Sequence, residues 1–209
     1  MNTIVISNVH REPLVWPYVQ DMKPIRTFTP DWPYHCIGQF RCFHGHTQAL
    51  TCYMTDDTAC VMEDDCVPYE DTPWKDVINA ANQLVLDGSY EIVCLHGRGF
   101  DFNKFDNFDA HGFNWLKPKT EYRWVLGTLI YVIGKNAAKK FIDSDFWLHG
   151  TNIDLFLWSH LFNFCMIDPC QFEQQVNLQK AIEHPKPFKH DRHQGSIIEN
   201  PKNVECVIR

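Results

Sequence analysis

Apolar residues gather along the chain in short runs and in helically spaced stripes, a pattern that predicts an α/β fold. Apolar or β-branched runs predict strands at residues 2–8, 24–29, 59–62, 90–95, 124–133 and 163–167, the fifth being one long strand or a pair. Helical spacing predicts helices at residues 12–22, 45–55, 74–86, 135–142 and 152–162. Residues 30–40 and 100–119 show no clear period, and we expect loops there.

Length, composition and net charge favour some classes of protein and argue against others. A chain of 209 residues fits one domain, and its hydrophobic fraction of 44% is typical of a soluble globular protein. The net charge of -7 argues against sequence-independent nucleic-acid binding over the whole surface, although a local basic patch remains open. No apolar run is long enough to span a membrane and the N-terminus lacks a signal-peptide pattern, so we expect a cytoplasmic protein.

The nine cysteines are an odd number and show no Cys-x-x-Cys pairing. Several of them lie inside apolar runs, which is typical of buried free thiols in a reducing compartment. Their number and spacing do not support a zinc cluster.

Three consecutive carboxylates, Glu63, Asp64 and Asp65, follow the predicted strand at residues 59–62. Adjacent like charges repel and are costly to bury, so a bound cation is a simple compensation. Carboxylate oxygens suit Mg²⁺ or Mn²⁺, and ligands of open α/β sheets bind at the carboxyl ends of strands. The alternative is a solvated acidic loop without a metal.

Four segments, in order along the chain, carry a resemblance to a known family. They are Arg-Cys-Phe-His-Gly-His at residues 41–46, Val-Met-Glu-Asp-Asp-Cys-Val at 61–67, Gly-Thr-Leu-Ile-Tyr-Val-Ile-Gly-Lys-Asn-Ala-Ala at 127–138, and Asn-Ile-Asp at 152–154. The chain thereby resembles glycosyltransferase family 25, which contains lipopolysaccharide and collagen galactosyltransferase relatives. Arg41 and Gly45 depart from the Gly and Ser of the family's first motif, which leaves the role of that segment open.

The resemblance implies a single GT-A-like domain over residues 1–209, an α/β fold with a mostly parallel central sheet flanked by helices. Residues 1–95 would form the half that binds the nucleotide sugar, and residues 96–180 the acceptor half. Residues 181–209 would be a basic, His-rich C-terminal segment.

The implied activity is transfer of a sugar from a nucleotide diphosphate, with uridine as the expected nucleoside, to an acceptor hydroxyl with inversion. Asp65 would bind Mn²⁺ or Mg²⁺, together with His190 or His193 from near the C-terminus. Asp64 or Glu63 would bind a ribose hydroxyl or a metal-bound water. Lys189 or Arg192 would pair with phosphate, unless the C-terminal segment is only a solvated basic tail.

Other roles follow from the same resemblance, each with a plainer alternative. Asp154 would deprotonate the acceptor, or would simply lie at the start of a helix, where the helix dipole weakens its basicity. His46 would contact the donor or buttress the sheet, and Arg11 would approach the diphosphate or lie on the surface. Aromatic residues at 100–115 would stack on the acceptor or belong to an ordinary loop.

The acceptor is left open between a saccharide and a hydroxylated base in DNA, the latter suggested by the basic stretch at residues 186–202. Two other classes compete with a glycosyltransferase. A metal-dependent phosphoesterase or nuclease would need further acidic ligands on other strand ends. A non-catalytic binding module would have no need of the intact carboxylates.

Overall fold

The computed structural model describes residues 1–7, 12–28, 38–97, 100–119, 125, 127–144, 153 and 162–174, with the backbone alone for residues 38–41. Within these ranges a large sheet is built from β1 (Asn2–Ser7), β2 (Ile25–Phe28), β3 (Thr58–Glu63), β5 (Ile92–Cys94), β6 (Phe105–Ala110), β7 (Phe113–Pro118), β8 (Ile130–Gly134) and β9 (Phe164–Ile167). Two further strands, β4 (Cys66–Pro68) and β10 (Phe172–Gln174), pair with each other in antiparallel fashion.

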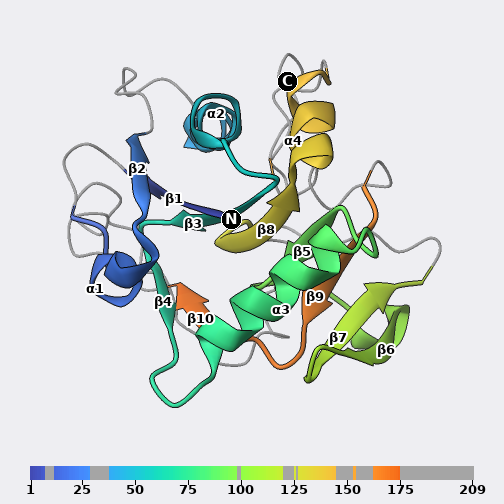
Figure 1. Ribbon diagram of the computed structural model, residues 1–209. Helices are drawn as coiled ribbons and strands as arrows, with labels where there is room; N and C mark the ends of the chain where they lie inside the picture. The colour runs from blue at the N-terminus through green and yellow to red at the C-terminus, as the bar shows by residue number, and fades with distance from the viewer. Residues whose placement is uncertain are drawn as a thin grey trace, which may run out of the picture.

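The order across the large sheet is β2-β1-β3-β8-β5-β9-β7-β6 (Figure 1). Strands β2, β1 and β3 are mutually parallel, as are β5 and β9. Strand β8 runs antiparallel to both β3 and β5, and β7 runs antiparallel to both β9 and β6. Among the described strands of this sheet, all except β7 and β8 therefore point the same way, and the α/β fold class with a mixed, mostly parallel sheet is confirmed.

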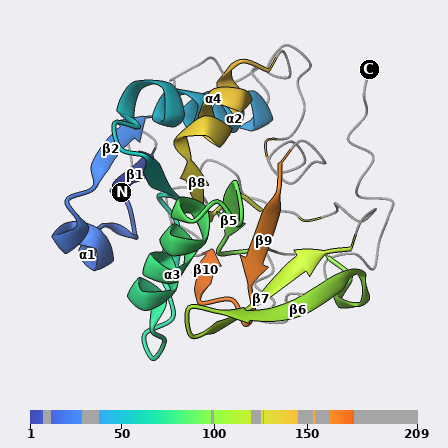
Figure 2. The same ribbon diagram turned by 45° about the vertical axis from the view of Figure 1, so that its right-hand side comes forward.

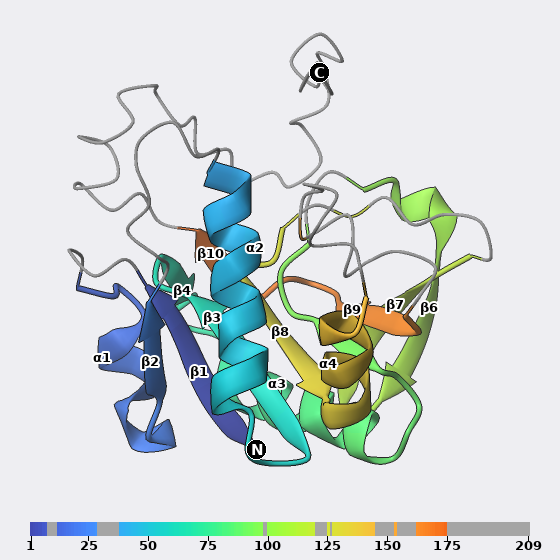
Figure 3. The same ribbon diagram turned by 90° about the horizontal axis from the view of Figure 1, so that it is seen from above.

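Helices cover both faces of the sheet. Helix α2 (Gly38–Gln48), its π-helical continuation η2 (Ala49–Tyr53) and α4 (Lys135–Ile142) lie on one face (Figures 1 and 3). Helix α3 (Trp74–Leu86) packs on the other face, where the short α1 (Trp16–Val19) and the 3-10 helix η1 (Gln20–Met22) also contribute. None of the described helices has the length and apolar character needed to cross a bilayer.

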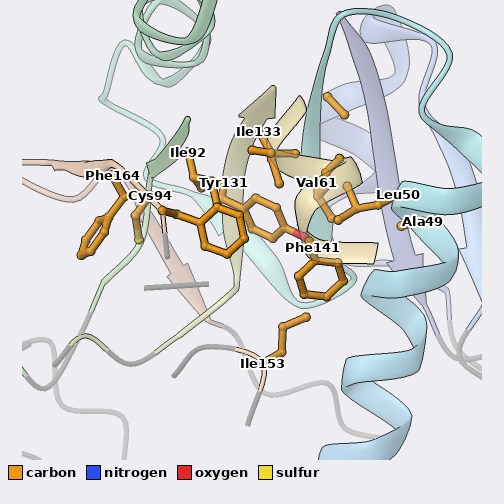
Figure 4. Close-up of a cluster of buried hydrophobic side chains, with 14 of the residues drawn as sticks. Ala49, Leu50, Val61, Ile92, Cys94, Tyr131, Ile133, Phe141, Ile153 and Phe164 are labelled. Carbon is orange, nitrogen blue, oxygen red and sulfur yellow. The ribbon is translucent and has the colours of Figure 1, made fainter. Parts of the chain in front are cut away.

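Alternate side chains of β3 belong to two different core clusters, one on each face of the sheet, because successive side chains of a strand point in opposite directions. Ala59 and Val61 pack toward α2 and α4, in a cluster that also contains Tyr131 of β8 (Figure 4). Cys60 and Met62 pack toward α3. Glu63 follows the parity of Ala59 and Val61, and its side chain therefore turns toward α2.

The bounds of α3 and α4 match the predicted ranges, because each helix has a clean apolar face and a clear end. Helix α3 buries Val77, Ile78, Ala81 and Leu84, among others, at helical spacing. It ends at Leu86, and Gly88, two residues later, has the positive φ of 78° that favours glycine just after a helix. Helix α4 starts directly after β8 and buries Ala137, Ala138 and Phe141.

The loop predicted at residues 100–119 is wrong: these residues form the short 3-10 helix η3 (Phe102–Lys104) and the β6–β7 hairpin. The hairpin extends the sheet beyond β9 (Figure 2). His111 and Gly112, with φ of 49° and 83°, form the two-residue turn, a geometry that suits the twist of a hairpin. Strand β6 lies at the sheet edge, and its exposed polar residues conceal the alternating pattern of a strand.

Three other boundaries differ from the sequence prediction. In the range 12–22, helical structure begins only at Trp16, as α1 followed by η1. Helix α2 begins at Gly38, inside the range predicted as a loop, and ends its α-helical part at Gln48 instead of residue 55. Strand β8 covers only the last part of the range 124–133 and extends to Gly134. The predicted helix at residues 152–162 lies outside the described residues, except for Ile153 and Phe162.

Candidate active site

The three carboxylates lie at the carboxyl end of β3, where the order of strands changes direction. The chain runs from β1 to β2 on one side of β1, and then to β3 on the other side. Both pairings are parallel, and Ile6 near the end of β1 is opposite Glu63. Such a reversal opens a crevice at the carboxyl ends of the strands, which is the usual ligand position in open α/β sheets.

Glu63 is held by its backbone and its side chain. Its amide donates a 2.8 Å hydrogen bond to the carbonyl of Leu129, and the Thr128 hydroxyl donates to Oε1 at 2.8 Å. His46 Nε2 lies 3.6 Å from the same oxygen. The Glu63 side chain is 22% exposed, so it lies next to the buried histidine and is also in contact with solvent.

His46 is fully buried between α2 and β8. Its Nδ1 lies 2.9 Å from the Tyr131 hydroxyl, and the two rings are stacked with centroids 5.6 Å apart. Burial, aided by the nearby Cys42 and Glu63, holds the pKa of Tyr131 well above its usual value. The phenol is therefore neutral at physiological pH and presents a hydroxyl to the imidazole at all times.

Asp64 and Asp65 form hydrogen bonds with parts of the chain other than α2. The Asp64 carbonyl accepts hydrogen bonds from the amides of Leu14 and Val15 at 2.7 and 3.4 Å, which ties the segment before α1 to the end of β3. Asp65 is 1% exposed, and its Oδ2 accepts a 3.0 Å hydrogen bond from the amide nitrogen of Gln174. This hydrogen bond ties the Asp65 side chain to β10.

The structure brings some of the predicted site residues together. Glu63 and His46 form one group with Cys42, and a ligand atom from each lies within 4.8 Å of the others. Asp64 and Asp65 follow Glu63 directly and connect β3 to β4, the strand that pairs with β10. The remaining predicted residues, namely Arg11, Asp154, Lys189, His190, Arg192 and His193, lie outside the described residues, and their roles stay predictions.

Four further residues lie close to the carboxylates or to His46 and were not predicted as site residues: Cys42, Thr128, Tyr131 and Gln174. Cys42, Thr128 and Tyr131 all lie in segments that resemble the family, and the spacing of Cys42 and His46 by four residues could have indicated a shared helix face. Thr128 lies in the segment before β8. No signal in the sequence indicates that Gln174 pairs with Asp65, because 109 positions separate them.

The aromatic residues at 100–115 mainly build the core. Trp115 is fully buried and its indole nitrogen donates to the carbonyl of Ala110 at 2.9 Å, and Phe105 is also buried. Their faces are therefore not available for stacking on an acceptor. Phe102 is 52% exposed, and its ring centroid lies 4.6 Å from that of the partly buried Phe100.

No protein-family model matches the sequence, and no curated protein matches it. Among solved structures, the chain is similar to A197 from STIV, with a TM-score of 0.48 and 13% identity over 85% of this chain and 87% of that one. It is also similar to a glycosyltransferase involved in the glycosylation of the major capsid of PBCV-1, with a TM-score of 0.46 and 11% identity over 80% and 81% of the two chains.

A third similar structure is HddC from Yersinia pseudotuberculosis, with a TM-score of 0.40 and 14% identity over 80% of this chain and 69% of that one. Identities and TM-scores of this size carry no information on activity.

Proposed function

We propose that the protein is a metal-dependent glycosyltransferase that moves a sugar from a nucleotide diphosphate, with uridine as the expected nucleoside, to an acceptor hydroxyl. The observation that carries the proposal is the position of Glu63, Asp64 and Asp65 at the carboxyl end of β3, where the strand order reverses. This is where nucleotides bind in open α/β sheets, and oxygen ligands there suit Mn²⁺ or Mg²⁺. The four segments that resemble glycosyltransferase family 25 support the same activity.

The donor site would be built around Asp65. Its buried carboxylate, with a hydrogen-bond donor on one oxygen, fits a hard cation, and His190 or His193 would complete the protein ligands. A bound Mn²⁺ or Mg²⁺ would stabilise the negative charge of the leaving diphosphate. Asp64 or Glu63 would bind the ribose, and Arg11 and Lys189 would pair with phosphate oxygens.

The transfer itself would be a single displacement with inversion. The acceptor oxygen bonds to the anomeric carbon while the bond from that carbon to the diphosphate oxygen breaks. The proton of the acceptor hydroxyl passes to Asp154, which acts as the general base. The nucleoside diphosphate leaves with the electron pair of the broken bond.

Ligand-dependent melting tests the donor site. Uridine, guanosine and cytidine diphosphates are added to the full chain with and without Mn²⁺, each at about 100 times its dissociation constant. One of them should raise the melting temperature by about 5–10 °C in the presence of the metal. Asp65→Asn should abolish the shift, whereas Asp109→Asn, at an exposed position of β6, should retain it. The absence of a shift with all three nucleotides would overturn the proposal.

The acceptor is either a saccharide or a hydroxylated base in DNA. Once the donor is known, mass spectrometry can follow transfer to a panel of monosaccharides and to DNA duplexes with and without hydroxymethylated cytosine. Transfer to the modified duplex alone, with a rate that falls as salt rises, would establish the DNA acceptor. Transfer to a saccharide alone would establish the other class.

A further inference from the structure

A second group of possible metal ligands lies at the carboxyl end of β3, on the face of the sheet covered by α2. Cys42 and His46 are four residues apart on α2, so their side chains share one face of the helix. Glu63, the last residue of β3, lies beside this face, with Oε1 3.6 Å from His46 Nε2. One ligand atom from each residue lies within 4.8 Å of the other two.

His46 provides the independent observation that points to a ligand. Its side chain is fully buried, and Nδ1 is engaged by the Tyr131 hydroxyl. Among the described residues, Nε2 has no hydrogen-bond partner, and it is directed toward Glu63 Oε1 at 3.6 Å, which is beyond hydrogen-bonding distance. A buried nitrogen without a partner is costly, and a coordinated cation would remove that cost.

The chemistry of the three ligands selects the ion. A thiolate, an imidazole and a carboxylate together suit Zn²⁺, whereas Mg²⁺ and Mn²⁺ prefer oxygen ligands alone. Two ligands about 2.1 Å from a tetrahedral ion lie about 3.4 Å apart, close to the observed distance of 3.6 Å between His46 Nε2 and Glu63 Oε1. We propose that Cys42, His46 and Glu63 bind one Zn²⁺, with the fourth position open to water or to a ligand.

The residues around the three ligands have the properties of an outer shell. A metal-bound histidine normally donates its other ring N–H to a fixed acceptor, and the Tyr131 hydroxyl lies at 2.9 Å from Nδ1. Thr128 donates to Glu63 Oε1 and so orients the carboxylate. Cys42 and Glu63 are only partly buried, which leaves the ion a route from solvent.

The site does not depend on the proposed glycosyltransferase activity. It does constrain that proposal, because a Glu63 side chain that binds Zn²⁺ is not available to bind the ribose. Asp64 would then be the residue that binds the ribose. The two sites also differ in the metal they bind. The spectroscopic test below therefore succeeds or fails independently of the melting experiment with nucleotides.

Cobalt substitution tests the site on the full chain. After removal of metals with a chelator, Co²⁺ should bind at one equivalent per chain and produce a thiolate-to-metal charge-transfer band in the near ultraviolet. The band should disappear in Cys42→Ser and persist in Cys52→Ser, a matched control at an exposed cysteine of η2. Zn²⁺ should displace Co²⁺ and abolish the band.

Two results would overturn the proposal. One is the absence of the band in a wild-type chain that is folded by circular dichroism. The other is a band of unchanged intensity in Cys42→Ser, which would place the thiolate elsewhere. Tyr131→Phe should lower the Co²⁺ affinity about 10–100-fold while retaining the band, because it removes only the partner of Nδ1; an unchanged affinity in this variant would contradict the orienting role of Tyr131.

Discussion

The ring nitrogen Nδ1 of His46 and the hydroxyl of Tyr131 lie 2.9 Å apart in the buried layer between α2 and β8. The pair connects a helix to the strand that lies between β3 and β5 in the sheet. Because the Tyr131 phenol remains neutral, it can donate to Nδ1 or accept from it as the histidine tautomer requires. The pair therefore fixes the orientation of His46 toward Glu63 in either tautomer.

Removal of the Tyr131 hydroxyl should destabilise the protein. In Tyr131→Phe the buried Nδ1 of His46 loses its hydrogen-bond partner, which should lower the free energy of unfolding by about 1–3 kcal/mol. Urea unfolding at pH 7 without added metal measures this loss. Tyr18→Phe, at a partly exposed tyrosine before η1, serves as the control and should change stability by less than about 0.5 kcal/mol. Equal losses in the two variants would refute the buried pair.

Two leucines of α3 should differ sharply in their contribution to stability. Leu84 is 3% exposed and packs on the sheet, whereas Leu86 is 52% exposed on the same helix. Leu84→Ala should cost about 2–5 kcal/mol, because it removes buried apolar surface and leaves a cavity. Leu86→Ala should stay within about 0.5 kcal/mol of the wild type. Comparable denaturation midpoints for the two variants would contradict the orientation of α3.

The turn of the β6–β7 hairpin should require glycine at position 112 because of its backbone conformation and not because of a lack of space for a side chain. Gly112 has φ of 83°, and no atom lies within 4 Å of the position a Cβ would take. Gly112→Ala should therefore cost about 1–2 kcal/mol through left-handed backbone strain and without a steric clash. His111→Asn should be neutral or slightly stabilising, because asparagine adopts this region readily. Thermal unfolding of both variants measures the difference, and a neutral Gly112→Ala would argue against the two-residue turn.

Alkaline pH should destabilise the fold. Burial raises the pKa of the thiols of Cys60, Cys94 and Cys165, and it raises the pKa of Tyr90 to about 12. These groups keep their protons in the folded state at pH values where the unfolded chain has lost them, so stability falls as pH rises. The fall should begin near the ordinary cysteine pKa of about 8.5, and each buried thiol contributes at most about 1.4 kcal/mol per pH unit.

Urea unfolding between pH 7 and pH 10.5 checks this slope. Tyr90→Phe should make the profile less steep above about pH 10, where an exposed tyrosine ionises. The same variant should leave the slope between pH 8.5 and pH 9.5 unchanged, since the thiols dominate there. Stability that rose with pH over this range would contradict the burial of these groups.

The sequence predicted α3, α4, β1 and β9 closely, because each combines an uninterrupted apolar pattern with a clear beginning or end. It predicted a helix over the second part of α2 and over η2, but it placed the start at residue 45 instead of Gly38. The polar residues Gln39, Arg41 and His44 interrupt the apolar pattern of the first two turns of α2. It failed for the hairpin because β6 lies at the sheet edge and has exposed acidic residues on both sides.

The carboxylates of the candidate site could be predicted from the sequence because they follow a buried strand directly. Their partners could not be predicted, because each comes from a distant part of the chain. Thr128 contacts Glu63 across 65 positions, and Tyr131 contacts His46 across 85. Such pairings follow from the insertion of β8 between β3 and β5, a topological feature that local patterns do not encode.

The short pairing of β4 with β10 has a consequence for the order of events during synthesis. Asp65 gains its hydrogen bond from Gln174 only when β10 is available, and Cys66 is opposite Gln174 in the same pairing. A chain emerging from the ribosome can form β1, β2 and β3 long before that point, since N-terminal elements are made first. The Asp65 carboxylate thus lacks its Gln174 partner on the nascent chain until residue 174 has emerged, and this part of the site is completed late in translation.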